Sequence, residues 1–110
     1  MPDKGSELVQ GTLDMLILRT LALEPMHGYG IALRIEHISR GVFRVNPGSL
    51  FPALRRLERE GGIKPEWRPT ENNRRAKYYT LTDRGRKHLK AETREWGRQI
   101  AAITRILEVC

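Results

Sequence analysis

The chain of 110 residues contains one cysteine, Cys110, so an internal disulfide framework is excluded. No stretch approaches the roughly 20 uninterrupted apolar residues of a membrane-spanning helix. The most apolar segment, residues 8–23, is broken by Asp14 and Arg19. The first residues show no basic run followed by an apolar core, so no signal peptide is expected. These absences predict a protein of the reducing cytoplasm that makes no membrane contact.

Motifs of catalysis and metal binding are also lacking. The three histidines are scattered without an HExxH pattern, and a single cysteine cannot form a CxxC pair. The segment GYGIAL (28–33) begins like GxGxxG but lacks the third glycine, and Ser49 lacks a GxSxG context. The sequence therefore predicts no enzyme, metal site or cofactor, and we interpret His27 as a turn or capping residue.

What the sequence does have is an ordinary globular composition. Hydrophobic residues make up 39% of the chain, and ten glycines accompany them. A chain of this length buries one modest core, on the order of 65% of its unfolded surface. The composition excludes a disordered chain, and the length excludes a two-domain enzyme.

The net charge of +7 is concentrated in one third of the chain. Residues 55–90 carry twelve basic and five acidic side chains, whereas residues 1–54 and 91–110 are each balanced. Arginine outnumbers lysine by 15 to 5. Because the planar guanidinium suits bidentate contacts with phosphate or guanine, this bias favours a nucleic-acid partner over a merely solvated basic surface.

Apolar spacing predicts three short helices in the first half of the chain. The first covers residues 8–23, the second residues 28–39, and the third follows a cap at Asn46 or Ser49 and runs to Glu60. Pro52 is expected in or near the first turn of the third helix, where a missing N–H matters least.

The second half reads as a hairpin and one long helix. Strands are predicted over residues 63–68 and 76–81, with Trp67 and one of Tyr78 or Tyr79 packed into the core. Thr82 is a natural N-cap for a helix over residues 83–109.

The predicted fold is therefore mainly α with a two-stranded β wing, a winged helix-turn-helix followed by a long C-terminal helix. We divide the chain into a disordered start (1–7), the winged helix-turn-helix domain (8–81) and the C-terminal helix (82–110).

The third helix is predicted to have one apolar face and one free face. At about 100° per residue, Leu50, Ala53, Leu54 and Leu57 cluster on the core side. A small polar residue, an aromatic ring and arginines on the other side suit the major groove, although an ordinary surface helix has a similar pattern. The candidate DNA contacts are Phe51, Pro52, Arg55 and Arg59, with Ser49 and Arg56 on the flanks.

A second group of candidates lies at the hairpin tip, where three cations fall within four residues. They are Arg74, Arg75 and Lys77, preceded by Asn73. Such a tip can reach the DNA backbone or a minor groove. A solvated turn is the alternative, but clustered like charges repel unless a polyanion neutralises them.

Apolar residues of the last helix repeat with a heptad pattern. Leu89, Trp96, Ile103 and Cys110 recur every seven residues, and Thr93, Ile100 and Leu107 follow the same period with an offset of four. This 4-3 seam favours pairing with a second copy, and the alternative is a helix that folds back on its own domain. Trp96 is interpreted as packing in the seam or as a flat surface for a planar effector.

Four segments together resemble the PadR family of bacterial transcriptional regulators. They are LVQGTLD (8–14), HGYGI (27–31), GSLFPALRRLE (48–58) and RRAKYYTLT (74–82), and the resemblance extends over about residues 8–109. It implies a winged-helix DNA-binding domain, a C-terminal dimerisation helix and, for most members, a repressor relieved by small aromatic or hydrophobic compounds. This chain is similar in length to the short members, which have a single C-terminal helix; some of them bind ligands at the dimer interface.

The resemblance also suggests residue roles. Ser49, Phe51, Pro52 and Arg55 match recognition-helix positions, and Asn73, Arg74, Arg75 and Lys77 match the wing. The family usually has tyrosine at the position of Phe51, so this chain lacks one hydroxyl there.

From both lines of reasoning we expect a homodimeric, ligand-responsive repressor that is associated with the nucleoid. It would bind a pseudo-palindromic operator in double-stranded DNA. The alternative is a winged-helix adaptor that binds an acidic protein and no specific DNA.

Overall fold

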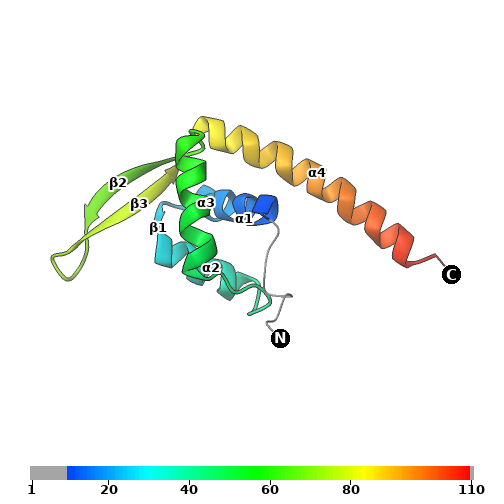
Figure 1. Cartoon of the computed structure of the whole chain (residues 1–110), viewed down its shortest axis with the longest axis horizontal. Helices are drawn as coiled ribbons and strands as arrows, with labels where there is room; N and C mark the ends of the chain where they lie inside the picture. Colours follow the sequence, from blue (N-terminus) through cyan, green and yellow to red (C-terminus); the bar gives the residue numbers. More distant parts are fainter. Residues whose placement is uncertain (1–9, 110) are drawn as a thin grey trace.

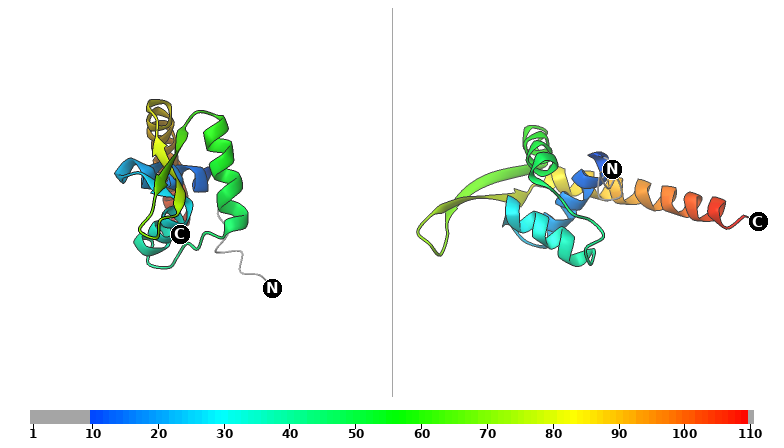
Figure 2. Two further views of the ribbon diagram at one scale, coloured as in Figure 1. Left: turned by 90° about the vertical axis from the view of Figure 1, so that its left-hand side faces the viewer. Right: turned by 60° about the horizontal axis from the view of Figure 1, so that its bottom comes forward.

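The computed structural model describes residues 10–109, which form four helices and three strands (Figure 1). In chain order the elements are α1 (Gln10–Leu23), β1 (Met26–His27), α2 (Gly28–Ile38), α3 (Pro47–Arg59), β2 (Ile63–Pro69), β3 (Arg75–Leu81) and α4 (Asp83–Leu107). The wing of β2 and β3 and the helix α4 project from opposite sides of the body that α1, α2 and α3 form (Figures 1 and 2). The expected disordered start and Cys110 lie outside the described residues.

Side-chain caps begin α2 and α3. The imidazole Nδ1 of His27 accepts a hydrogen bond from the backbone N–H of Gly30 at 3.0 Å, which confirms the capping interpretation. Asn46, not Ser49, caps α3, since its Oδ1 accepts from the Ser49 N–H at 2.9 Å. Pro52 stands in the second turn of α3, not the first, so the Gly48 carbonyl lacks its usual helical donor.

The sheet has three antiparallel strands in the order β1-β3-β2, one more than the predicted hairpin. The additional strand pairs Met26 with Tyr79 and His27 with Tyr78. A strand of two residues shows no alternation, so sequence periodicity could not reveal it. Tyr79 is buried as one of the two tyrosines was expected to be, but the prediction for Trp67 was wrong because 56% of its surface is exposed.

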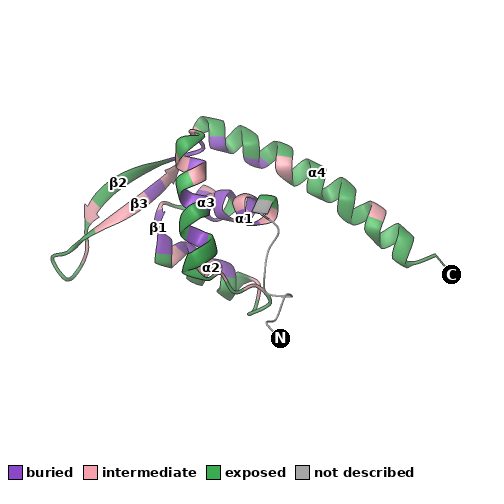
Figure 3. Cartoon of the chain, in the orientation of Figure 1, coloured by how far each residue is buried: buried purple, intermediate pink, exposed green. Residues whose placement is uncertain are grey.

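The core lies where α1, α2 and α3 meet the base of the wing (Figure 3). Ile17 and Leu18 of α1 are fully buried at its centre, and Ile31, Leu54 and Ile63 pack around them from three other elements. This packing fixes the orientation of α3 relative to the wing.

The junction between the wing and α4 depends on close backbone approach. The hydroxyl of Thr82 accepts from the Gly85 N–H at 3.0 Å and donates to the Gly61 carbonyl at 2.6 Å. A Cβ atom on Gly85 would lie only 2.0 Å from the carbonyl oxygen of Gly62. Glycine is therefore required at position 85, although it lowers the intrinsic stability of the helix.

Helix α4 extends beyond the body. Its 25 residues span about 37 Å at ~1.5 Å per residue, and the molecule measures 60 × 35 × 21 Å. After Leu89 its surface is mostly exposed (Figure 3). None of the helices within residues 10–109 combines the length and the apolar character needed to cross a membrane.

Candidate nucleic-acid interface

The two faces of α3 separate as the periodicity predicts. Leu50, Ala53, Leu54 and Leu57 are each at most 2% exposed. The opposite face is open to solvent and holds most of the predicted DNA contacts. The exposed candidates on α3 are Ser49, Phe51, Pro52, Arg55 and Arg59.

Arg56 does not belong to this free face. Its guanidinium forms a bidentate ion pair with Asp14 of α1, with Nε–Oδ2 at 3.3 Å and Nη2–Oδ1 at 2.5 Å. The two side chains are only 20% and 14% exposed. Arg56 therefore fixes α3 to α1, and its prediction as a DNA contact is corrected here. Its position on the helical flank allowed either role, and the acidic partner 42 residues away decided it.

Phe51 packs against the start of α2. A Cβ atom on Gly28 would lie 3.1 Å from Cε1 of the Phe51 ring, so the absence of a side chain lets the ring approach the backbone. The ring remains 43% exposed. Phe51 is thus supported on one side by the start of α2 and remains partly exposed to solvent.

A cleft of about 510 Å³ separates α3 from the wing. Phe51 and Arg55 of α3 line one side, and Lys77 lines the other. The Lys77 ammonium is 3.3 Å from Glu58 of α3 and 5.5 Å from the centre of the Tyr79 ring, so it connects the wing to the helix. The structure therefore brings two candidates of α3 together with a third from the wing, more than 20 residues later in the sequence.

Two further residues of the cleft were not predicted. Tyr29, at the first turn of α2, is 69% exposed, and Thr70 stands where the wing turns. Tyr29 lies in the HGYGI segment, which resembles the family, but no binding role was predicted for this residue. The signal for Tyr29 is the exposure of a large aromatic side chain at a helix start. Exposure is a property of the tertiary structure, so the sequence alone did not show it.

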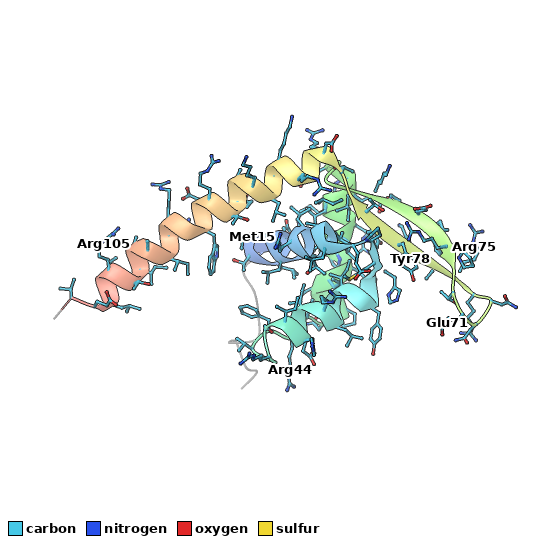
Figure 4. All side chains as sticks on the ribbon, turned by 180° about the vertical axis from the view of Figure 1, so that it is seen from behind. Met15, Arg44, Glu71, Arg75, Tyr78 and Arg105 are labelled. Atoms are coloured by element: carbon cyan, nitrogen blue, oxygen red, sulfur yellow. The ribbon has the colours of Figure 1, made fainter. Side chains whose placement is uncertain are left out.

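The wing turn presents its cations outward. Asn73 adopts a left-handed backbone conformation (φ 60°), and its N–H donates to the Thr70 carbonyl at 3.1 Å. Asparagine tolerates this conformation better than most residues, which explains Asn73 structurally. Arg74 and Arg75 are exposed, and neither forms an ion pair with a described residue. Figure 4 shows Arg75 near the far end of the wing.

The predicted seam on α4 is divided by the structure. Leu89 is 8% exposed because it packs into the core of its own body, so its prediction as a dimer contact is corrected. The remaining described positions of the seam are exposed. They are Thr93, Trp96, Ile100, Ile103 and Leu107.

A second groove, of about 710 Å³, runs between α1 and α4, where Leu89 and Thr93 line it together with Arg19, Arg86, Lys90 and Arg94. Among residues 10–109, no three His, Cys, Asp or Glu side chains come together as a metal site would require.

These features define a winged helix-turn-helix protein: a capped helix with a free basic face, a supporting helix behind it and a cationic hairpin beside it. Comparison with known proteins places this architecture in a family. The model of the Transcriptional regulator PadR-like family matches residues 17–91. The chain belongs to this family of transcriptional regulators, for which DNA binding is implied.

Individual relatives agree with this assignment. The Transcriptional regulator Rv3488 of Mycobacterium tuberculosis is 33% identical over 88 residues, which cover 80% of this chain and 78% of that protein. A transcriptional regulator of Clostridium thermocellum has a similar structure (TM-score 0.82, 28% identity), with 90% of this chain and 96% of that chain covered. A PadR-like transcriptional regulator of Bacillus cereus also has a similar structure (TM-score 0.80, 26% identity), with 92% and 96% covered.

Proposed function

We propose that this chain is a sequence-specific DNA-binding repressor that acts as a homodimer on a pseudo-palindromic operator. Helix α3 enters the major groove and the wing holds the flanking backbone. The cleft that joins Phe51 and Arg55 of α3 to Lys77 of the wing is the observation that supports this proposal most directly.

The roles of the cations follow from their position. Arg55 and Arg59 project from the free face of α3 and read base edges or adjacent phosphates. Arg74 and Arg75 at the wing turn and Lys77, two residues further along β3, contact the phosphate backbone. Ser49 in the first turn of α3 and Asn73 in the wing turn are both exposed, and their side chains can donate to phosphate oxygens.

Dimerisation through α4 would bring a second α3 helix, from the other copy, to the DNA. Trp96, Ile100 and Ile103 form an exposed apolar row, which a second copy would cover. The two α3 helices would then lie about 34 Å apart, or a multiple of that, to reach successive major grooves on one side of the duplex. A small aromatic or hydrophobic effector that binds beside Trp96 would act only by preferring one dimer geometry.

The test is duplex binding measured by fluorescence anisotropy over a range of salt concentrations, followed by selection of bound genomic fragments. We expect salt-dependent binding to random duplex and tighter binding to the selected sites. Arg55→Ala should weaken binding to the selected sites by about 1–3 kcal/mol. Arg105→Ala is the matched control, because it removes the same charge from the far end of α4 (Figure 4). Absence of salt-dependent binding would favour the adaptor. If Arg55→Ala lost equal affinity for random and selected DNA, Arg55 would contact a phosphate and not a base.

A further inference from the structure

Trp67 is a large aromatic side chain that does not pack into the core of the protein. It lies on β2 with 56% of its surface exposed, while Tyr79 on the neighbouring strand is 5% exposed. Exposing an indole to water forgoes about 1.5–3 kcal/mol of possible burial. An exposed tryptophan on a projecting wing therefore points to a partner.

The register of the hairpin gives the surroundings of Trp67. Trp67 stands opposite Lys77, and Pro69 stands opposite Arg75. Directly opposed residues share one face of an antiparallel pair, and so do alternate residues along each strand. The indole therefore shares its face with both cations, the face that also carries Tyr79 and approaches α3 through the Lys77–Glu58 ion pair.

Two kinds of protein partner fit this face poorly. Strand β2 is at the edge of the sheet, but Pro65 and Pro69 lack the N–H groups that an added strand would bind. A two-fold contact between copies would bring the Arg75 and Lys77 side chains of both copies together, where like charges repel. A polyanion with apolar surface between its charges matches both features of the face.

We propose that Trp67 contacts duplex DNA, with its ring packed against the sugar edge of the backbone next to phosphates held by Arg75 and Lys77. This inference rests on the proposed function and adds a residue to it. Deoxyribose presents C–H surface between phosphates, and the indole N–H can donate to a phosphate oxygen. The two prolines restrict the backbone of β2 on both sides of Trp67.

The test uses the whole chain labelled with 5-fluorotryptophan. The chain has two tryptophans, Trp67 and Trp96, so the ¹⁹F spectrum has two signals, and Trp67→Phe identifies one of them. With saturating random duplex at low salt, the Trp67 signal should shift and lose most of its H₂O/D₂O solvent-isotope effect. An unmoved Trp67 signal while anisotropy reports bound duplex overturns the proposal. A signal that shifts with protein concentration alone also overturns it, in favour of a contact between copies.

Affinity supplies a second readout. Trp67→Ala should weaken binding to duplex about tenfold, and Trp67→Phe, which keeps a flat ring, less than threefold. Leu33→Ala is the control, because it removes an exposed apolar side chain from α2, outside the wing. Circular dichroism verifies that each variant is folded. If the unaltered chain fails to bind duplex, the proposed function fails and this inference with it; if it binds and Trp67→Ala binds equally well, this inference alone is wrong.

Discussion

Helices α3 and α4 are both amphipathic, yet the chain covers the apolar face of only one of them. In α3, Leu50, Leu54 and Leu57 are each at most 2% exposed. In α4, Leu89 is buried, but Trp96 and the later apolar residues of the row up to Leu107 face solvent. The contrast teaches that periodicity identifies a face that needs a partner but does not say whether the partner belongs to the same chain.

The largest expected effect tests how tightly the body holds the start of α4. Gly85→Ala would place a methyl group 2.0 Å from the Gly62 carbonyl oxygen and 2.7 Å from Cδ1 of Leu81. We expect the free energy of unfolding to fall by about 3 kcal/mol, measured by urea denaturation with circular dichroism. Gly97→Ala is the control in the distal half, where nothing beyond the adjoining helical backbone lies within 4 Å of the new Cβ. It should leave stability unchanged or raise it by up to about 1 kcal/mol, and equal losses in the two variants would contradict the contrast.

The second prediction concerns the uncovered half of α4. Trp96→Asp should raise the dimer dissociation constant at least hundredfold, about 2.7 kcal/mol, because it places a charge in the apolar row. Sedimentation equilibrium measures the change, with Arg105→Asp as a control outside the heptad row. The body should remain folded, since Trp96 lies outside its core. Persistence of the dimer would show that the two copies do not pair through the apolar row of α4.

The third prediction separates neighbouring arginines on α3. Arg56→Ala should lower the free energy of unfolding by about 2 kcal/mol, because it leaves the poorly exposed carboxylate of Asp14 unpaired. Arg55→Ala should leave stability unchanged and affect only DNA binding, since Arg55 is exposed. Thermal unfolding of both variants decides the matter. If Arg55→Ala were the less stable of the two, the assignment of the helical faces would be wrong.

The smallest effect is expected at the wing. Arg75→Ala should weaken binding to all duplexes and reduce the slope of log K against log salt concentration by about one, because one phosphate contact is lost. The stability of the fold should not change, since Arg75 is exposed near the end of the hairpin (Figure 4). An unchanged salt slope would place Arg75 outside the DNA contact.

Prediction from sequence succeeded where a residue's neighbours are local. The cap at Thr82, the buried row of α3 and the strands on either side of Asn73 all follow from spacing within one turn or one hairpin. It failed where the partner is distant in sequence. Arg56 was directed inward by Asp14, and Leu89 was taken into the core of the body, and helical periodicity can report neither outcome.

The prediction that Trp67 is buried failed for a related reason. An aromatic residue in a predicted strand is usually core, but β2 extends past the body, and its outer half has no layer packed on it. Tyr29 was missed because a helix start reveals nothing about the groove it borders.

The sequence by itself determined the order of elements, the location of the positive charge and the existence of two apolar helical faces, because these properties depend on spacing along the chain. Only the tertiary structure decided which arginine faces solvent, which leucine belongs to the body, and that α3 and the wing share one cleft. Those outcomes depend on contacts between elements far apart in sequence, and such contacts form only when the core is packed.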